Sequence, residues 1–403
     1  TTTRLIRRGS CPATGAHLRN RVTLLASMAM ACIAAPLGAQ RVPDAAIPSE
    51  ADAPIAYLLD ATSGQILYQR EIDRRFMPAS ITKVMTTFLA FEWIDEGRLL
   101  RERIFGVRPE TFRQWHRKGS TMFLAEDARV SVDDLLHGVT TVSANDGAVV
   151  LAEGAAGSVE DWVAAMNAKA REIGMANSHF GNPNGWMDEG RTFVTARDLG
   201  TLAQAMVVRH PTKYRHFVGA QGLEYNGIEQ RNHDPITGVV PGADGIKTGY
   251  TNQAGFGFLG SAERDGQRLV MVVAGSPGGR ERRRAARQFI EWGFRNFDSR
   301  VLFAQNARIG TARVQEGGAG TVGLTTPRPL RIAVPRGRDP EISLTISYEG
   351  PLQAPVAKGE EVAELVVSIA GMPEHRVPLV AAEEVSEASI VRRVFNAFQS
   401  WLG

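Results

Sequence analysis

The pattern of apolar residues changes near residue 298, and this change limits the possible folds more than any other feature of the sequence. Before that point, segments typical of strands and of helices are mixed. From about Val301 to Val380, only short alternating runs remain, separated by Gly and Pro. A series of such runs is typical of a β-sandwich. We therefore expect an α/β domain at residues 40–297 and a small all-β sandwich at residues 298–382.

The first domain is predicted to combine an antiparallel sheet with helices. Residues 55–69 have the pattern of a hairpin, and apolar runs at 256–262 and 269–274 predict two further strands. The turns between neighbouring strands are too short for the crossovers that parallel strands need. Ser158 and Thr195 each precede an acid at a spacing typical of helix N-caps. Helices are expected over residues 80–93, from Ser131 into Leu135-Leu136, over 158–173, from Thr195 to Val208, and over 280–294.

The N-terminal segment has the layout of a secretory signal peptide. Five arginines and no acidic residue precede an apolar run from Val22 to Leu37, which is shorter than the roughly 20 residues that span a bilayer as a helix. Small residues ending at Ala39 suit a signal peptidase, so we expect removal of residues 1–39. The alternative is a lipoprotein anchored through Cys32, although the residues before this cysteine match such a signal poorly. The arginines are Arg4, Arg7, Arg8, Arg19 and Arg21.

Loss of residues 1–39 would change both the charge and the cysteine content of the chain. The net charge would fall from +3 to −2, because the segment carries five arginines and no acid. The remaining chain is then not basic, which argues against a nucleic-acid partner. Cys11 and Cys32 both lie in this segment. A cysteine nucleophile and a cysteine-based metal site are therefore excluded from residues 40–403.

Residues 383–403 are predicted to form a linker and an amphipathic helix. Residues 383–387 are rich in Glu, and seven apolar residues after them share one helical face opposite Arg392 and Arg393. Such a helix can lie in a membrane interface, so we expect peripheral attachment to the periplasmic side of the cytoplasmic membrane. The alternative is a helix docked on its own domain or on a partner. The apolar residues are Ile390, Val391, Val394, Phe395, Phe398, Trp401 and Leu402.

Lysine is rare in this chain, with six residues against 40 arginines, and two of the six lie in short polar motifs. An amine differs from a guanidinium because its pKa can fall far enough for it to act as a base. Ser80-Ile-Thr-Lys83 holds the first of these lysines, and Lys247-Thr248-Gly249 holds the second. Ser143-Ala-Asn145 lies between them in the sequence. These three motifs supply the candidate catalytic residues.

The motifs suit nucleophilic catalysis by serine. On a helix, Lys83 lies on the same face as Ser80 and can accept its proton, provided that the amine is neutral. Burial and a nearby cation such as Lys247 would penalise the charged form and lower the pKa of Lys83. At the start of a helix, the backbone N–H of Ser80 would point towards an oxyanion formed on its acyl group.

Taken one at a time, the motifs have ordinary structural explanations: an N-cap, a solvated lysine, a turn and a strand end. Their occurrence together, in this order and in a chain predicted to be secreted, favours an enzyme. The sequence contains neither a Gly-x-Ser-x-Gly elbow nor a His-Glu-x-x-His zinc motif. We therefore expect no metal and no cofactor. The histidines are interpreted as surface or core residues: His116, His137, His179, His210, His216, His233 and His375.

The order Ser-x-x-Lys, Ser-x-Asn, Lys-Thr-Gly resembles the signature of penicillin-recognising serine enzymes. Among them, the chain is similar to low-molecular-mass penicillin-binding proteins of the penicillin-binding protein 5 type, which are D-alanyl-D-alanine carboxypeptidases. The resemblance covers nearly all of residues 40–403. It implies a transpeptidase-like α/β domain, a β-sandwich domain and a terminal amphipathic helix. The segments that carry it are residues 78–86, 120–124, 143–147, 180–185, 195–198 and 244–251.

The resemblance also implies the catalytic roles. Ser80 would be the acyl-ester nucleophile and Lys83 its proton acceptor. Ser143 would pass a proton towards the leaving amine, and Asn145 would bind the substrate amide. The substrate would be a peptidoglycan stem peptide that ends in D-Ala-D-Ala, and β-lactams would be covalent inhibitors.

The remaining site residues would bind the substrate. Lys247 and Thr248 would face the terminal carboxylate, and Gly249 would let the substrate backbone lie close to the strand edge. The backbone N–H of Tyr250 would be the second oxyanion donor. Arg280 would bind the same carboxylate through its guanidinium.

Two alternative functions stay open at this point. One is another enzyme of the superfamily, a β-lactamase or a DD-endopeptidase, although the Glu-x-x-Leu-Asn segment of class A β-lactamases is absent from the sequence. The other is a scaffold that binds stem peptides without catalysis, against which the intact Ser80 and Lys83 argue. The chain also differs at two places from the sequence that is usual in the family. At Arg191-Thr-Phe193, relatives often carry a histidine, and at the position of Tyr250 the residue type varies among relatives. These departures bear on substrate preference.

Overall fold

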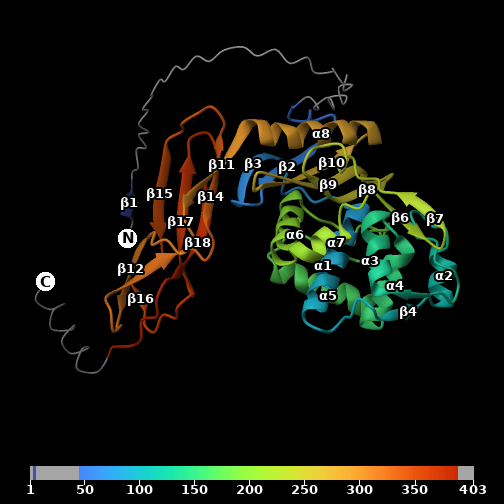
Figure 1. The fold of residues 1–403 in the computed structure, drawn as a ribbon, viewed down its shortest axis with the longest axis horizontal. Helices are drawn as coiled ribbons and strands as arrows, with labels where there is room; N and C mark the ends of the chain where they lie inside the picture. Colours follow the sequence, from blue (N-terminus) through green and yellow to red (C-terminus); the bar gives the residue numbers. More distant parts are fainter. Residues whose placement is uncertain (1–2, 6–44, 389–403) are drawn as a thin grey trace, which may run out of the picture.

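The computed structural model describes residues 3–5 and 45–388. The predicted amphipathic helix and nearly all of the predicted signal peptide therefore lie outside the described residues. Within the described residues, no helix has both the length and the apolar character needed to cross a membrane. Figure 1 shows two bodies: a mixed α/β domain and a smaller domain of strands.

The α/β domain contains a five-stranded sheet in which every pair of neighbours is antiparallel, as predicted. The order of its strands is β3-β2-β10-β9-β8, so β8 lies at one edge. The predicted hairpin and the two predicted central strands are confirmed. The strands are β2 (Ile55–Asp60), β3 (Gln65–Arg70), β8 (Ala243–Thr251), β9 (Gly255–Arg264) and β10 (Gln267–Ser276).

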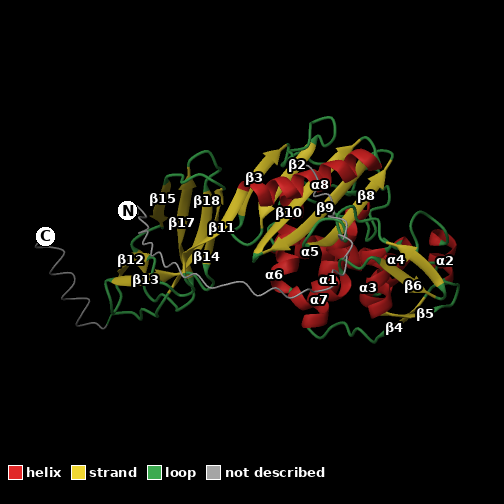
Figure 2. Ribbon diagram, turned by 45° about the horizontal axis from the view of Figure 1, so that its top comes forward, coloured by secondary structure: helices red, strands yellow, loops and turns green. Residues whose placement is uncertain are grey.

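Both faces of this sheet are covered by helices. Helix α8 (Gly279–Asn296) packs on one face, and a group of helices that includes α1 (Lys83–Asp95) and α6 (Ala196–Arg209) packs on the other (Figures 1 and 2). Alternate residues of β10 enter different cores: Met271 packs with α8, whereas Val272 packs with the helices on the opposite face. Double coverage explains why these strands appear in the sequence as continuous apolar runs.

The helices predicted from N-cap signals begin where expected. The backbone N–H of Asp161 donates to Ser158 Oγ at 3.0 Å, and that of Asp198 donates to Thr195 Oγ1 at 3.1 Å. Ser131 caps its helix in the same way. The further helices and small hairpins are α2 (Pro109–Trp115), α3 (Val132–Thr141), α4 (Asn145–Ala156), α5 (Val159–Glu172), α7 (Pro211–Phe217), β4 (Ile104–Gly106), β5 (Arg129–Ser131), β6 (Gly222–Tyr225) and β7 (Ile228–Arg231).

The second domain is made of strands in two layers. The larger sheet has the order β1-β15-β17-β18-β13-β12-β16, and the pair β11-β14 packs against it around a common apolar core. The strands are β1 (Thr3–Leu5), β11 (Phe297–Phe303), β12 (Gly310–Gln315), β13 (Thr321–Thr325), β14 (Leu330–Pro335), β15 (Ile342–Ser347), β16 (Leu352–Gln353), β17 (Glu361–Ile369) and β18 (His375–Ala381).

One sequence prediction is wrong in this domain: residues 383–387 are not a free linker. Val385 is buried and forms a β-bridge with Val356, and the Glu383 side chain accepts a hydrogen bond from the backbone of Gly323 at 2.7 Å. The acidic composition suggested a solvated segment. Its single valine, however, is the one apolar side chain between Ala382 and Ala388, and it is buried.

A polar contact between strands joins the two domains, beside the apolar packing of Ala333 and Met372 in the core around α8. Gln65 of β3 is almost fully buried; its Oε1 accepts from the backbone N–H of Ala333 in β14 at 2.6 Å, and its Nε2 donates to the carbonyl of Ala333 at 3.4 Å. This side chain therefore joins the edge of the α/β sheet to the smaller layer of the β domain.

Candidate active site

The three sequence motifs meet at a cavity of about 500 Å³ between β8 and the helical layer. The walls of this cavity include Ser80, Ser143, Asn145 and the segment Thr248–Asn252. The two motif lysines, Lys83 and Lys247, are buried behind the walls. The folded chain thus brings together residues that lie far apart in the sequence.

The Ser80–Lys83 pair has the geometry expected of a nucleophile and its base. Ser80 lies in a single 3₁₀ turn, Ala79–Thr82, which leads directly into α1, and Lys83 Nζ lies 2.9 Å from Ser80 Oγ. The turn differs from the α-helix predicted to begin at Ser80. The three-residue spacing still suits the contact, because side chains at i and i+3 eclipse in a 3₁₀ turn.

Two further contacts orient the Lys83 amine. Nζ donates to Asn145 Oδ1 and to the backbone carbonyl of Asn184, both at 2.7 Å. A neutral primary amine has two N–H donors and one lone pair. With both donors used by these acceptors, the lone pair is left for the hydroxyl hydrogen of Ser80. The arrangement therefore suits proton transfer from serine to lysine.

The surroundings of Lys83 favour its neutral form. Complete burial lowers the pKa of Lys83 well below its usual value, and the charge of Lys247 lowers it further, while Asp146 acts in the opposite direction. Burial and the neighbouring Arg282 lower the pKa of Lys247 to about 7. Both causes that act on Lys83, burial and a second cation, are those expected from the sequence.

The Ser143 motif lies at the turn between α3 and α4. Ser143 adopts a positive φ of 64°, and Asn145 begins α4. The backbone N–H of Asn145 donates to the carbonyl of Ser120 at 2.8 Å. Asp146 accepts from the backbone N–H groups of Met122 and Leu124 at 3.0 and 3.1 Å. These bonds fix the loop 119–124, of which Gly119 and Ser120 line the cavity. Sequence analysis did not assign this positioning role to Asp146, although its place after Asn145 was visible.

The Lys247 motif lies on β8, whose outer edge is unpaired among the described strands. Thr248 and Gly249 line the cavity there. An unpaired strand edge offers its backbone groups to an extended peptide. Tyr250 is half-exposed; its ring stacks on Phe256 with centroids 4.1 Å apart, at the rim of the cavity.

Gly249 has a packing role that the sequence did not predict. A side chain at this position would collide with the carbonyl of Pro78 and crowd Ile81, which belong to the segment around the nucleophile. The glycine therefore lets the Ser80 turn approach β8. That Gly249 also lets the substrate backbone lie close to the strand edge stays a prediction. The same atoms explain why the motif requires a residue without Cβ.

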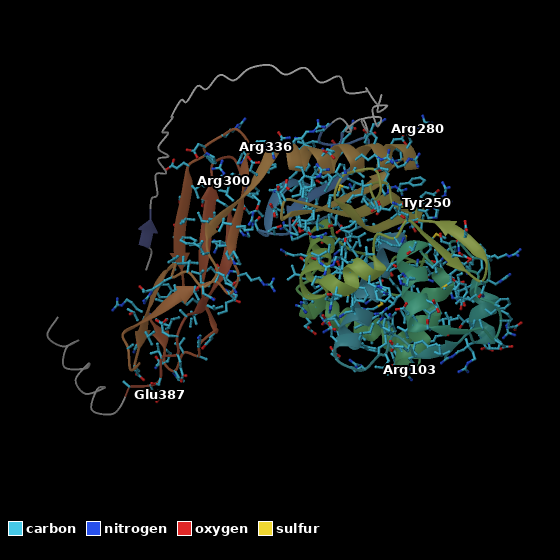
Figure 3. All side chains as sticks on the ribbon, in the orientation of Figure 1. Arg103, Tyr250, Arg280, Arg300, Arg336 and Glu387 are labelled. Carbon is cyan, nitrogen blue, oxygen red and sulfur yellow. The ribbon has the colours of Figure 1, made fainter. Side chains whose placement is uncertain are left out.

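Arg280 is not at the cavity, and this prediction is wrong. It is exposed near the start of α8 (Figure 3), whereas Arg282, two residues later, is buried and lines the cavity. Arg282 Nε has no hydrogen-bond partner among the described residues, which leaves it available to an anion. Helical periodicity could have identified it, because Arg282 shares the inner face of α8 with Ala285 and Phe289.

Two other residues of the cavity were not predicted as site residues. His233 lies beside the cationic cluster, and its pKa is lowered by partial desolvation and by the charges of Lys247 and Arg282. Trp186 lies on the opposite wall, where Lys118 Nζ sits 5.2 Å from the ring centroid. Neither residue belongs to a short motif, so only the fold could place them.

The comparisons with known proteins agree with this geometry. A family model described as D-alanyl-D-alanine carboxypeptidase matches residues 42–278, which is more than half of the chain. The chain belongs to the D-alanyl-D-alanine carboxypeptidase family. A second model, described as the C-terminal domain of penicillin-binding protein 5, matches residues 297–387.

Members of the carboxypeptidase family resemble this chain over nearly its whole length. D-alanyl-D-alanine carboxypeptidase DacD of Escherichia coli (strain K12) is 30% identical over 386 residues, which cover 94% of this chain and 99% of that protein. DacF of Bacillus subtilis (strain 168) is 28% identical and covers 87% of this chain and 90% of its own length. The crystal structure of penicillin-binding protein 5 from Haemophilus influenzae gives a TM-score of 0.74 at 30% identity, covering 85% of this chain and 100% of that one. The predicted fold class is therefore confirmed for both domains.

Proposed function

We propose that this chain is a serine D-alanyl-D-alanine carboxypeptidase that removes the terminal D-alanine from peptidoglycan stem peptides. Family membership supports the reaction class. The observation that carries the assignment of residues is the 2.9 Å contact between Lys83 Nζ and Ser80 Oγ, made by an amine whose pKa is lowered by burial. A binding scaffold has no need of such an arrangement.

Acylation begins when Ser80 Oγ attacks the carbonyl carbon of the penultimate D-alanine. Its proton moves to Lys83, and the negative charge on the carbonyl oxygen is stabilised by the backbone N–H groups of Ser80 and Tyr250. The C–N bond then breaks, and the leaving amine receives a proton through Ser143, leaving an ester on Ser80. Water, activated by the neutral Lys83, hydrolyses this ester and restores the free hydroxyl.

The substrate lies as an additional strand along the open edge of β8. Asn145 binds its amide from the opposite wall. The terminal carboxylate is held by Thr248, Lys247 and Arg282, and this charge also favours the protonated form of Lys247. The buried guanidinium of Arg282, free at Nε, supports this orientation.

The decisive experiment compares substrate turnover with covalent labelling. The purified chain is incubated with diacetyl-Lys-D-Ala-D-Ala and, separately, with labelled penicillin, beside Ser80→Ala and Lys83→Arg. We expect release of D-alanine and a long-lived penicillin adduct, with both signals reduced at least about 10³-fold in each variant. The Lys83→Arg variant replaces the neutral amine with a group that stays protonated and cannot accept the proton of Ser80.

The outcomes separate the alternatives. Rapid turnover of penicillin with a short-lived adduct would indicate a β-lactamase. Absence of D-alanine release, together with labelling that survives Ser80→Ala, would overturn the carboxypeptidase assignment. Unchanged melting temperatures of the variants establish that any loss comes from the chemistry.

We also propose that the enzyme acts in the periplasm, attached to the cytoplasmic membrane through residues 389–403. The arginine-rich apolar N-terminus and the two-sided pattern of the C-terminal residues support this location. Fractionation of cells that produce the chain with or without residues 389–403 tests the attachment. We expect the full chain with the membranes and the truncated chain in the periplasmic extract; equal partitioning of both would refute attachment by this segment.

A further inference from the structure

A cluster of metal-binding side chains lies outside the catalytic cavity. Asp133 and His137 stand one turn apart on α3, and His216 comes from α7. One potential ligand atom from each residue lies within 4.8 Å of the other two. None of the three lines the catalytic cavity, and the proposed reaction uses none of them.

The spacing is close to that of a tetrahedral zinc site. His137 Nε2 lies 3.7 Å from one carboxylate oxygen of Asp133, and His216 Nε2 lies 3.7 Å from the other. Zinc binds histidine nitrogen and carboxylate oxygen at about 2.0 to 2.2 Å, which places neighbouring ligand atoms about 3.4 Å apart. The three ligand atoms lie within 4.8 Å of one another, so closing the cluster around an ion needs movements of at most roughly 1.4 Å and a rotation of the carboxylate.

The elements that carry the ligands are held together by other contacts. Thr140 Oγ1 donates to the backbone carbonyl of Phe217 at 2.6 Å and so joins the end of α3 to the end of α7. The ring of Phe217 also contacts both histidine rings, with centroids 4.8 Å from His137 and 4.5 Å from His216. The two helices thus hold their relative position without an ion, which reduces the entropy lost on binding.

Arg101 is the group that an ion must displace. Its Nη2 contacts both Asp133 Oδ1, at 2.5 Å, and His216 Nε2, at 2.7 Å, so it uses atoms that a metal would need. Its Nε also donates to Asp133 Oδ1, at 2.8 Å. The side chain is 39% exposed, so it can swing into solvent at small cost.

We propose that Asp133, His137 and His216 form a binding site for a divalent transition-metal ion, with Zn²⁺ as the best fit. Two neutral imidazoles and one carboxylate are the ligands that zinc takes in sites that keep an open fourth position. The ion ties α7 to α3. α3 ends just before Ser143, and α7 is followed by the segment that leads to β8. The ion therefore stabilises the relative position of two elements that lead into the cavity walls.

The test uses the purified chain without a histidine tag and Zn²⁺ alone, measured by isothermal titration calorimetry. We expect one ion per chain, with affinity reduced at least ten-fold in His137→Asn and in His216→Asn. His116→Asn removes an exposed histidine away from the cluster and should bind as the parent does. Affinities of the cluster variants equal to that of the parent would overturn the proposal.

A further variant tests the role of Arg101. Arg101→Gln removes the competing cation and frees His216 Nε2, so zinc should bind several-fold more tightly. Zinc should also raise the melting temperature of the parent but not of the double variant His137→Asn/His216→Asn. Weaker binding by Arg101→Gln, or equal thermal shifts in the parent and the double variant, would refute the assignment. Circular dichroism without zinc confirms that each variant is folded.

Discussion

Lys83 shows how burial changes the chemistry of a single side chain. Nothing in the local sequence Ser-x-x-Lys fixes the protonation state of the amine. The fold does so, because it removes Lys83 from water and brings Lys247 near it, and both effects lower the pKa of Lys83. In a protein without a catalytic role for a neutral lysine, the same burial would only lower the stability.

The pH dependence of the acylation rate should follow the deprotonation of the Lys83 amine. The base works only when neutral, so the rate constant for acylation by penicillin should rise with pH and level off well below about 10.4, the pKa of a solvated lysine. Lys247→Gln removes the charge that lowers the pKa of Lys83, so its inflection should move to higher pH. Because the pKa of Lys247 is about 7, this charge acts mainly below pH 7. An inflection unmoved by the substitution would contradict the electrostatic coupling.

The contact between the substrate carboxylate and Arg282 can be tested with Arg280 as the control. Arg282→Ala should lower kcat/KM for the tripeptide roughly 10- to 100-fold, because a charge-assisted hydrogen bond to the substrate is worth about 1.5–3 kcal/mol. Arg280→Ala should stay within about two-fold of the parent, since that side chain is exposed and away from the cavity. Steady-state kinetics decide the matter, and equal losses in the two variants would show that neither guanidinium meets the carboxylate.

At the residue scale, the motifs predicted the catalytic residues of the cavity but not the rest of its walls. Ser80, Lys83, Ser143, Asn145 and the Lys247 motif all meet there. Residues without a motif were missed, because only packing brings them into place. The error over the helical arginine came from assigning Arg280 through the resemblance, without testing which arginine lies on the inner face of the helix.

At the scale of elements, β8 and the Ser80 turn pack closely because Gly249 has no side chain. Gly249 lets the carbonyl of Pro78 lie against the strand. The strand would otherwise stand off from the turn, and the oxyanion donors on the two elements would separate. The glycine thus sets a distance between elements.

Substitution of Gly249 tests this dependence. Gly249→Ala should force the turn away from β8, which costs about 1–3 kcal/mol of stability and slows penicillin acylation. Gly106→Ala is the control, because a Cβ there meets no atom within 4 Å and the glycine has no positive φ. Thermal melts and acylation rates should separate the two variants; equal behaviour would mean that the turn can shift without loss.

Elements with strong local signals were predictable, and fully buried ones were not. Capped, amphipathic helices such as α5 and α6 began at their predicted Ser158 and Thr195. Helix α4 was missed because its first two turns are buried on all sides, so that no polar face gives a helical period. The 3₁₀ turn at Ser80 was taken for α-helix, since the two share the same local spacing.

At the scale of the whole molecule, the change of pattern near residue 298 predicted two domains but not their contact. The contact depends on Gln65, which looks in the sequence like any polar residue of a strand. Only the fold shows that its amide bonds both backbone groups of Ala333. Side-chain amides that satisfy a neighbouring strand carry no sequence signal.

Gln65→Ala should weaken this contact and leave catalysis intact. It leaves the backbone groups of Ala333 unsatisfied, at a cost of about 1–3 kcal/mol. We expect faster proteolysis between α8 and β11 and a separation of the two domains in calorimetric unfolding, with unchanged kcat/KM. Gln69→Ala, an exposed residue of the same strand, is the control. Protease resistance equal to that of the parent would show that the domains are held by other contacts.

The position of β8 at the edge of the sheet also affects how the protein is made. Ser80 and Lys83 leave the ribosome long before Lys247. Among the described strands, the one that carries Lys247 pairs only with β9, which is synthesised later still. A nascent chain that has emerged only as far as α7 therefore holds its serine without the surroundings that activate it. An antibiotic present during synthesis would find no reactive target until the last strands are in place, so it can inactivate only finished molecules.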